Sequence, residues 1–171
     1  MGAVVEAEGK LAEIERAIEG VAQRAANARA GYVYVISNIG SFGDEVVKIG
    51  LTRRLDPLDR VRELGDASVP FGFDVHAIVF SDDAVSLETA LHHRFAERRV
   101  NLVNLRREFF RVTARQVKEA LVEFQGNLLS FMDVPEALEW RQSQTTLRQQ
   151  APADRTAPLR DAGARIDSEL A

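Results

Sequence analysis

The stretch Tyr32-Val33-Tyr34-Val35 is followed, after a turn-rich segment, by Lys48-Ile49-Gly50. Both stretches are rich in β-branched and aromatic residues, whereas residues 37–44 carry glycine, serine, asparagine and aspartate. This pattern predicts a β-hairpin with a long connection, because the first composition favours strands and the second favours turns. We expect its strands over residues 32–37 and 46–51.

The chain around this hairpin predicts one more strand and several helices. Side chains alternate over residues 73–80, as in a half-buried strand, with Val75, Ala77 and Val79 facing one way and His76, Ile78 and Phe80 the other. Asp56 and Pro57 suit the N-cap and first position of a helix, and Asp82-Asp83 and Thr113 suit the caps of two others. We therefore expect an α+β fold with a small three-stranded antiparallel sheet flanked by helices. A short extended piece is expected over residues 108–112.

Residues 3–29 carry one uninterrupted apolar pattern, whose members are spaced alternately by three and four positions: Val4, Ala7, Leu11, Ile14, Ile18, Val21, Ala25 and Ala28. An a/d seam held over about four heptads is typical of a coiled coil. We expect a parallel homodimer through residues 3–29. The alternative is a helix that packs this stripe onto its own domain.

The end of the chain has a different composition. From residue 142 onward it holds almost no large apolar residues, so it cannot bury enough surface to offset its conformational entropy. Three parts are therefore expected: a coiled-coil helix over residues 1–30, a folded domain with C-terminal helices over residues 31–140, and a disordered tail over residues 141–171.

Composition limits the possible functions. The chain has 171 residues and no cysteine, which excludes disulfides, zinc fingers and cysteine catalysis. We find neither a signal peptide nor an apolar run of about 20 residues, so no membrane association is expected and a cytoplasmic location is the default. The net charge of −4 argues against a sequence-blind DNA coat. Two arginine-rich groups, within residues 53–62 and 94–111, could still form a basic face; the alternative is solvated faces with local ion pairs.

Four polar residues that suit phosphodiester cleavage occur in order on the predicted hairpin and helices: Tyr34, Lys48, Arg60 and Glu88. A divalent ion, Mg²⁺ or Mn²⁺, can act as a Lewis acid while one or two carboxylates hold it, and Glu88 could do so. The Arg60 guanidinium could donate two parallel hydrogen bonds to phosphate oxygens. His92 follows Glu88 by four positions and shares its helix face, so it could lie beside the metal or the scissile phosphate.

The order and types of these residues resemble the GIY-YIG nuclease superfamily. Tyr32-Val33-Tyr34 would be its first motif and Lys48-Ile49-Gly50 its second. The resemblance is greatest to a phage-type branch found behind coiled coils in bacterial and phage proteins, in which Lys-Ile-Gly stands in the second motif. It extends over roughly residues 31–113 and ends on a segment like the branch's closing Asn-Arg-Glu-Phe-Phe, here residues 104–110.

The resemblance implies a metal-dependent endonuclease with a role for each catalytic residue. Tyr34 would orient or deprotonate the attacking water, Arg60 would be the catalytic arginine, with Arg62 as its first substitute, and Glu88 would bind the metal. Lys48 departs from the usual tyrosine of the superfamily, and it could serve as a base or as a phosphate anchor. Tyr34 could equally do no more than cover the sheet.

Other residues are expected to bind nucleic acid or to support the site. The expected contacts to phosphates are Arg53, Arg54, Arg62, Arg106 and Arg107. The expected supporting residues are Tyr32, Gly50, His76 and Asn104, with Gly50 leaving room for the substrate and Asn104 holding the backbone or Glu88. The partner is expected to be DNA, or alternatively RNA.

Two other readings remain open. The domain could be a catalytically inactive, nuclease-like module that binds nucleic acid or a partner protein, which the lysine at position 48 and the acidic net charge favour. It could also be a small domain with a purely structural role. The sequence does not decide the strandedness of the nucleic acid.

Overall fold

The computed structural model describes residues 2–66, 68–125 and 130–150, and its centre is a four-stranded antiparallel sheet. The strands are β1 (Gly31–Ser37), β2 (Val47–Thr52), β3 (Asp74–Ser81) and β4 (Phe109–Phe110), in the order β3-β1-β2-β4. The α+β class is confirmed, but the expected three-stranded sheet is wrong. The extended piece of the chain pairs with β2 and adds the fourth strand, with Lys48 opposite Phe109.

The predicted hairpin is confirmed. Strands β1 and β2 pair in antiparallel register with Tyr34 opposite Gly50. Their connection contains the short helix α2 (Ile39–Phe42), which begins where the Asn38 side chain accepts a hydrogen bond from the Ser41 amide. Gly43 follows with a φ of 85°, a conformation that glycine adopts without the steric penalty of a Cβ.

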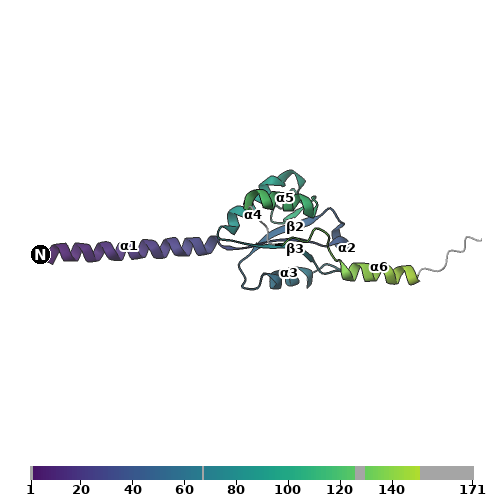
Figure 1. Cartoon of the computed structure of the whole chain (residues 1–171), viewed down its shortest axis with the longest axis horizontal. Coiled ribbons are helices and arrows are strands. Elements are labelled where there is room, and N and C mark those ends of the chain that lie inside the picture. The colour runs from purple at the N-terminus through teal and green to yellow at the C-terminus, as the bar shows by residue number, and fades with distance from the viewer. Residues whose placement is uncertain (1, 67, 126–129, 151–171) are drawn as a thin grey trace, which may run out of the picture.

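Helices cover both faces of the sheet (Figure 1). The helices α4 (Ala84–Arg94) and α5 (Ala114–Gln125) lie on one side, and α3 (Pro57–Asp66) lies on the other. Between α4 and α5 the chain makes a turn of 3-10 helix, Ala96–Arg98. The larger core lies under α4 and α5, and a smaller core under α3 is formed by Tyr34, Ile36 and Val61.

The predicted helix starts are confirmed. The Asp56 carboxylate accepts a hydrogen bond from the Leu58 amide, and the Asp83 carboxylate accepts one from the Ser86 amide. At α5, the Gln116 amide donates to the Thr113 hydroxyl, while the Thr113 amide donates to the Gln116 side chain. This reciprocal pair is a capping box, and it satisfies two amides that have no partner inside the helix.

Helix α1 (Gly2–Arg29) extends away from the domain (Figure 1). Its last residue anchors it, because the Arg29 guanidinium donates to the Asp83 carboxylate at 2.9 Å and to the Ser86 hydroxyl at 2.7 Å. Three members of its apolar seam are exposed by 56–62%: Ile14, Ile18 and Val21. These residues therefore do not pack onto their own domain, so that alternative is wrong for them.

Helix α6 (Leu138–Gln150) corrects the expected start of the tail. Residues 141–150 were expected to be disordered, but they continue a helix that begins at Leu138. Two contacts fix its start, since the Ala137 amide donates to Asp74 and the Gly72 amide donates to Glu139. The rest of the expected tail, residues 151–171, lies outside the described residues. In the part of the chain that is described, no helix has the length and apolar character needed to span a membrane.

A register shift places His76 on the face opposite to the one expected. Simple alternation predicts that it shares a face with Ile78, but the β1–β3 register slips between Val35 and Ile36. The His76 ring therefore stacks on Phe131, its Nε2 contacts the Ser37 hydroxyl at 2.9 Å, and its Nδ1 contacts the Met132 carbonyl at 2.6 Å. His76 is buried and joins β1 to the segment after α5, so its expected supporting role lies in the fold.

Candidate functional site

The free edge of β2 is where the candidate catalytic side chains meet. Strand β4 pairs only with Val47 and Lys48, and one further hydrogen bond joins the Ile49 amide to the Glu108 carbonyl. Beyond this point, no other strand of the described residues pairs with β2 on that side. Side chains of α4 take this place: His92 contacts the Ile49 carbonyl, and the Leu51 backbone acts on Glu88, whose pKa it lowers. The end of β4 therefore leaves a gap in which polar side chains from both faces of the sheet can meet.

Tyr34 reaches across β2 because residue 50 is a glycine. A Cβ at Gly50 would lie 2.4 Å from the Tyr34 hydroxyl oxygen and 2.6 Å from the adjoining ring carbon. Gly50 thus leaves room for the Tyr34 ring, rather than for the substrate as its position suggested. Burial, and then the Glu108 carboxylate, raise the pKa of Tyr34 to about 12, although Arg60 opposes the rise. Tyr34 is therefore a neutral phenol near pH 7 and is suited to orienting a water molecule.

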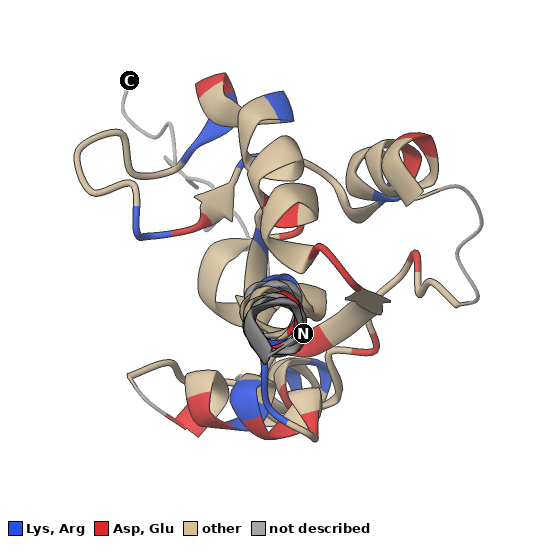
Figure 2. Cartoon of the chain, turned by 90° about the vertical axis from the view of Figure 1, so that its left-hand side faces the viewer, with Lys and Arg blue, Asp and Glu red and all other residues tan. Residues whose placement is uncertain are grey.

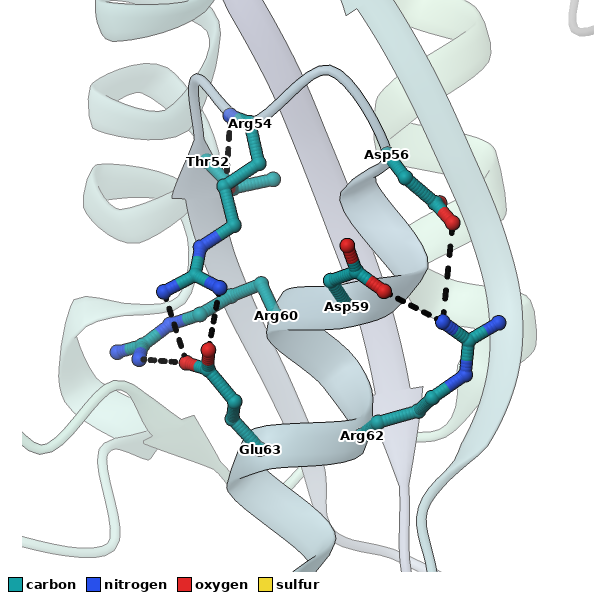
Figure 3. Close-up of polar contacts among 7 residues, drawn as sticks. All are labelled: Thr52, Arg54, Asp56, Asp59, Arg60, Arg62 and Glu63. Atoms are coloured by element: carbon teal, nitrogen blue, oxygen red, sulfur yellow. Dashed lines mark hydrogen bonds and ion pairs between the residues drawn. The ribbon is translucent and has the colours of Figure 1, made fainter.

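Arg60 belongs to a group of charged residues on α3 and in the segment before it (Figure 3). Its guanidinium donates to the Glu63 carboxylate at 3.4 Å, and it acts on the Tyr34 hydroxyl, whose pKa it lowers. Arg54 also donates to Glu63, and these contacts, with that of Arg54 first, lower the pKa of Glu63. A shallow pocket of about 360 Å³ lies beside them, lined by Leu51, Thr52, Arg53, Arg54 and Arg60. Three guanidinium groups around one hollow form a site suited to phosphate.

Arg62 does not share this pocket. It lies on another side of α3, where its guanidinium pairs with Asp59 at 2.6 Å and with Asp56 at 3.7 Å (Figure 3). It is therefore a poor substitute for Arg60. The view along α1 also shows acidic and basic positions next to one another below the sheet (Figure 2). The arginines of α3 thus form local ion pairs rather than one continuous basic face.

Lys48 lies on the same face of the sheet as Tyr34 and pairs with Glu108. Its ammonium group donates to the Glu108 carboxylate at 2.7 Å and lies 5.3 Å from the centre of the Phe109 ring. The Lys48 side chain is only 8% exposed. An ammonium held in this way is suited to neutralising charge on a phosphate. Of the two roles expected for Lys48, this favours the phosphate anchor over the general base.

Glu108 is the residue that sequence reasoning missed. It pairs with Lys48, and its charge acts on Tyr34, Glu88 and His92 as well. Its place follows from β4, because Phe109 pairs opposite Lys48 and so brings the preceding residue to the end of the ladder. The sequence predicts an extended piece over residues 108–112, but a two-residue strand carries no signal for the strand with which it pairs, so the contact of Glu108 with Lys48 was not predicted.

Glu88 is half-buried and has an unusual pKa. Burial, followed by repulsion from Glu108, raises the pKa of Glu88 to about 7, while Lys48 and Arg53 act in the opposite direction. Its charge also raises the pKa of Tyr34. The carboxylate from α4 is therefore electrostatically coupled to the phenol of β1 and to the lysine of β2, as the phosphodiester hypothesis requires.

His92 supports the edge of β2. Because a carbonyl oxygen only accepts, the 2.9 Å contact with Ile49 requires His92 Nε2 to carry the proton and donate it. The ring packs 5.0 Å from the Phe110 ring, and burial lowers the pKa of His92, which keeps the imidazole neutral. Only Nδ1 is left to contact a metal, water or substrate.

Four more of the expected residues lie apart from this edge. Asn104 orders its own loop, since its side chain accepts from the Arg106 amide and its carbonyl accepts from the Arg107 amide. It therefore holds the backbone rather than Glu88. Arg106 and Arg107 are exposed on the same loop, and neither side chain pairs with another of the described residues. Tyr32, by contrast, covers the sheet edge-on against Phe80, with ring centres 5.3 Å apart.

Comparison with known families gives one match. The family model of the T5orf172 domain matches residues 31–125, which is 95 of the 171 residues. The chain belongs to the T5orf172 domain family. No curated protein and no solved structure gives a significant match. The expected membership of the GIY-YIG superfamily is therefore wrong, since the T5orf172 domain is a different, nuclease-like family.

The T5orf172 match extends from β1 to the end of α5 and so includes every residue at the free edge of β2. Helices α1 and α6 lie outside it. The GIY-YIG resemblance misled because a tyrosine, a lysine, an arginine and a glutamate are side chains that many phosphodiester sites need. Shared chemistry of this kind does not distinguish one nuclease-like family from another.

Proposed function

We propose that this chain is a metal-dependent nuclease that hydrolyses phosphodiester bonds of DNA at the free edge of β2. The observation that carries the proposal is the electrostatic coupling of Tyr34, Lys48, Glu88 and Glu108, which come from four separate elements or their ends. Arg60 adds a guanidinium to the same group through its effect on the Tyr34 hydroxyl. The family match is compatible with this proposal because the T5orf172 domain is nuclease-like.

The donors at this edge suit a hard divalent cation. The described residues contain no group of three or more His, Cys, Asp or Glu side chains placed to hold a metal. Mg²⁺ commonly keeps several waters and takes only one or two protein carboxylates, which Glu88 can supply with Glu108 beside it. The raised pKa of Glu88 supports this fit, because a nearby cation would offset the repulsion between the Glu88 and Glu108 carboxylates. When bound, Mg²⁺ or Mn²⁺ supplies Lewis-acid stabilisation of the phosphate.

The chain's own residues would divide the remaining work. The Tyr34 hydroxyl orients the attacking water, because its raised pKa keeps it protonated and able to donate. Arg60 and Lys48 neutralise charge that builds up on the phosphate oxygens. His92 fixes the backbone edge beside them. Arg53 and Arg54 line the adjacent pocket and would meet phosphates of flanking nucleotides.

A cleavage assay with Glu88→Ala tests this function. Wild-type protein is incubated with plasmid and with single-stranded DNA in Mg²⁺ or Mn²⁺, and we expect the substitution to abolish cleavage while circular dichroism shows an intact fold. Glu119→Gln is the matched control, because Glu119 is an exposed carboxylate of α5 away from the edge. Glu88→Ala protein that cleaves at the wild-type rate would remove the proposed site.

The same assay separates the nuclease from a binding module. A protein that binds DNA without a divalent ion, loses binding steeply with salt and shows no turnover would be the inactive module instead. The ion pair of Lys48 with Glu108 is the observation that favours this second candidate, because it already neutralises a cation of the site. Cleavage that requires both the metal and Glu88 would exclude the binding module.

We also propose that a second copy of this chain covers the apolar seam of α1. The exposed Ile14, Ile18 and Val21 repeat at heptad spacing along a helix that stands away from its domain (Figure 1). A parallel pair would place two nuclease sites in one particle. Light scattering should give a dimer mass for the wild type and a monomer mass for Ile14→Asp with Ile18→Asp. A monomeric wild type at micromolar concentration would contradict this arrangement.

A further inference from the structure

A surface pocket of about 380 Å³ lies next to the candidate site, beside helix α2 and strand β4. Its wall is apolar and aromatic, formed by Phe42, Val46, Val100 and Phe109, and Asn101, Arg107 and Arg111 complete the lining. None of these side chains is needed for the chemistry proposed above. The pocket is therefore a second feature of the same face that requires its own explanation.

The aromatic wall is unusually open to solvent. Phe42 is 40% exposed, although it contacts the Phe109 ring at 5.1 Å and the Phe73 ring at 6.3 Å. The Phe73 and Phe109 rings lie 6.5 Å apart, so the three form one cluster. Phe42 is exposed and the other two rings are half-buried, so the cluster offers flat apolar surface on which another planar ring can stack.

The two arginines of the pocket differ from those of α3. Arg54, Arg60 and Arg62 all form ion pairs with carboxylates of α3 or the residues before it. Arg107 and Arg111 are exposed, and neither makes an ion pair or a side-chain hydrogen bond with any residue in the described ranges. Two uncompensated guanidinium groups at the mouth of an apolar hollow suit a ligand with a planar apolar part and a negative charge beside it.

Lys48 and Phe109 join this pocket to the candidate site. Phe109 forms a wall of the pocket, and the Lys48 ammonium lies 5.3 Å from the centre of the same ring. A strand that places one phosphate near Lys48 and Arg60 would therefore carry a neighbouring nucleotide past the pocket. A base that is paired in a duplex is stacked on both faces and cannot enter such a hollow, whereas an unpaired base can.

We propose that the pocket lined by Phe42 and Phe109 takes one unpaired nucleobase of a single-stranded nucleic acid, whose phosphates contact Arg107 and Arg111. The inference rests on the proposed function for the identity of the ligand, and it adds a preference for single-stranded over duplex substrate. It also gives Arg107 a specific place on the bound strand.

Binding measured without a divalent ion tests the pocket separately from the chemistry. Full-length protein is titrated in EDTA against a fluorescein-labelled thymidine oligonucleotide and against a duplex of the same length. We expect Phe42→Leu and Arg111→Gln each to weaken single-strand binding about tenfold, because stacking on one ring or one phosphate contact is lost. Binding of the duplex should be weaker in the wild type and unchanged in the variants.

Two matched controls and a direct readout complete the test. Phe80→Leu and Arg115→Gln change an exposed phenylalanine and an exposed arginine outside the pocket, and both should bind as the wild type does. An oligonucleotide that contains 2-aminopurine should lose fluorescence on binding the wild type, through stacking, but much less on binding Phe42→Leu. A Phe42→Leu protein that binds the single strand and quenches the fluorescence as strongly as the wild type would overturn the inference. Cleavage that survives in Glu88→Ala would instead refute the proposed function and leave this binding result standing.

Discussion

At the scale of single residues, the candidate site depends on residues whose neighbours make room for them or neutralise their charge. Gly50 makes room for the Tyr34 ring, and Glu108 pairs with a lysine that is almost completely buried. The same carboxylate helps to raise the pKa of Glu88. Each of these effects depends on two residues that are distant in the sequence lying close together in the fold. They are therefore visible only in the folded chain.

Gly50→Ala should displace Tyr34. The added Cβ would lie 2.4 Å from the hydroxyl oxygen, so the buried ring must move, at a cost of about 1–3 kcal/mol in the free energy of unfolding. We expect DNA cleavage to be lost while the protein still folds, as measured by denaturant unfolding and a plasmid assay. Gly72→Ala is the control, because its Cβ would meet only the Glu139 carboxylate at 3.8 Å. Equal effects of the two substitutions would argue against this role of Gly50.

Glu88→Gln should change how stability depends on pH. A carboxyl whose pKa rises from 4.5 to about 7 on folding binds its proton more tightly in the folded state. In metal-free buffer the free energy of unfolding of the wild type should therefore fall as pH rises from about 4.5 to 7. The full effect would be roughly 3 kcal/mol, which partial solvation reduces to about 2 kcal/mol.

The glutamine variant lacks this titration. In EDTA it should be more stable than the wild type at pH 8 by about 2 kcal/mol and show little difference at pH 4. Urea unfolding at the two pH values measures both quantities. A wild type whose stability rises over this range faster than that of the variant would show that the pKa of Glu88 is not raised.

At the scale of elements, the regular parts of the fold were predictable and the short ones were not. The hairpin and the helix starts at Asp56, Asp83 and Thr113 carry local signals, and the structure confirms them. Strand β4 has two residues and no periodicity, so its pairing with β2 depends on distant contacts. The register slip in β3 likewise arises between strands, which is why the face of His76 was predicted wrongly.

The capping box of α5 can be tested on its own. Thr113→Ala removes the hydroxyl that accepts from the Gln116 amide, and we expect a loss of about 1 kcal/mol in the free energy of unfolding. Thr89→Ala is the control, because the Thr89 hydroxyl bonds to the Val85 carbonyl inside α4, where alanine favours the helix. Thermal unfolding should show a melting temperature below that of the wild type for Thr113→Ala but not for Thr89→Ala. A Thr113→Ala protein as stable as the wild type would show that the cap contributes nothing.

At the scale of the whole molecule, a nuclease-like domain lies between two helices outside the family match. Helix α1 carries the exposed seam that we propose a second copy covers, and α6 packs its start against the loop before β3 (Figure 1). The candidate site lies where the sheet is left incomplete, at the point where β4 ends beside β2. Residues from both faces meet there because one short strand leaves the rest of the edge free.

The most direct measurement of the central claim is a crystal structure with Mn²⁺ and a short phosphorothioate DNA strand that resists cleavage. We predict an anomalous manganese peak at the Glu88 carboxylate, with one phosphate group within hydrogen-bond distance of Arg60 and Lys48. Manganese bound elsewhere, or a strand that crosses the molecule away from the free edge of β2, would contradict the account.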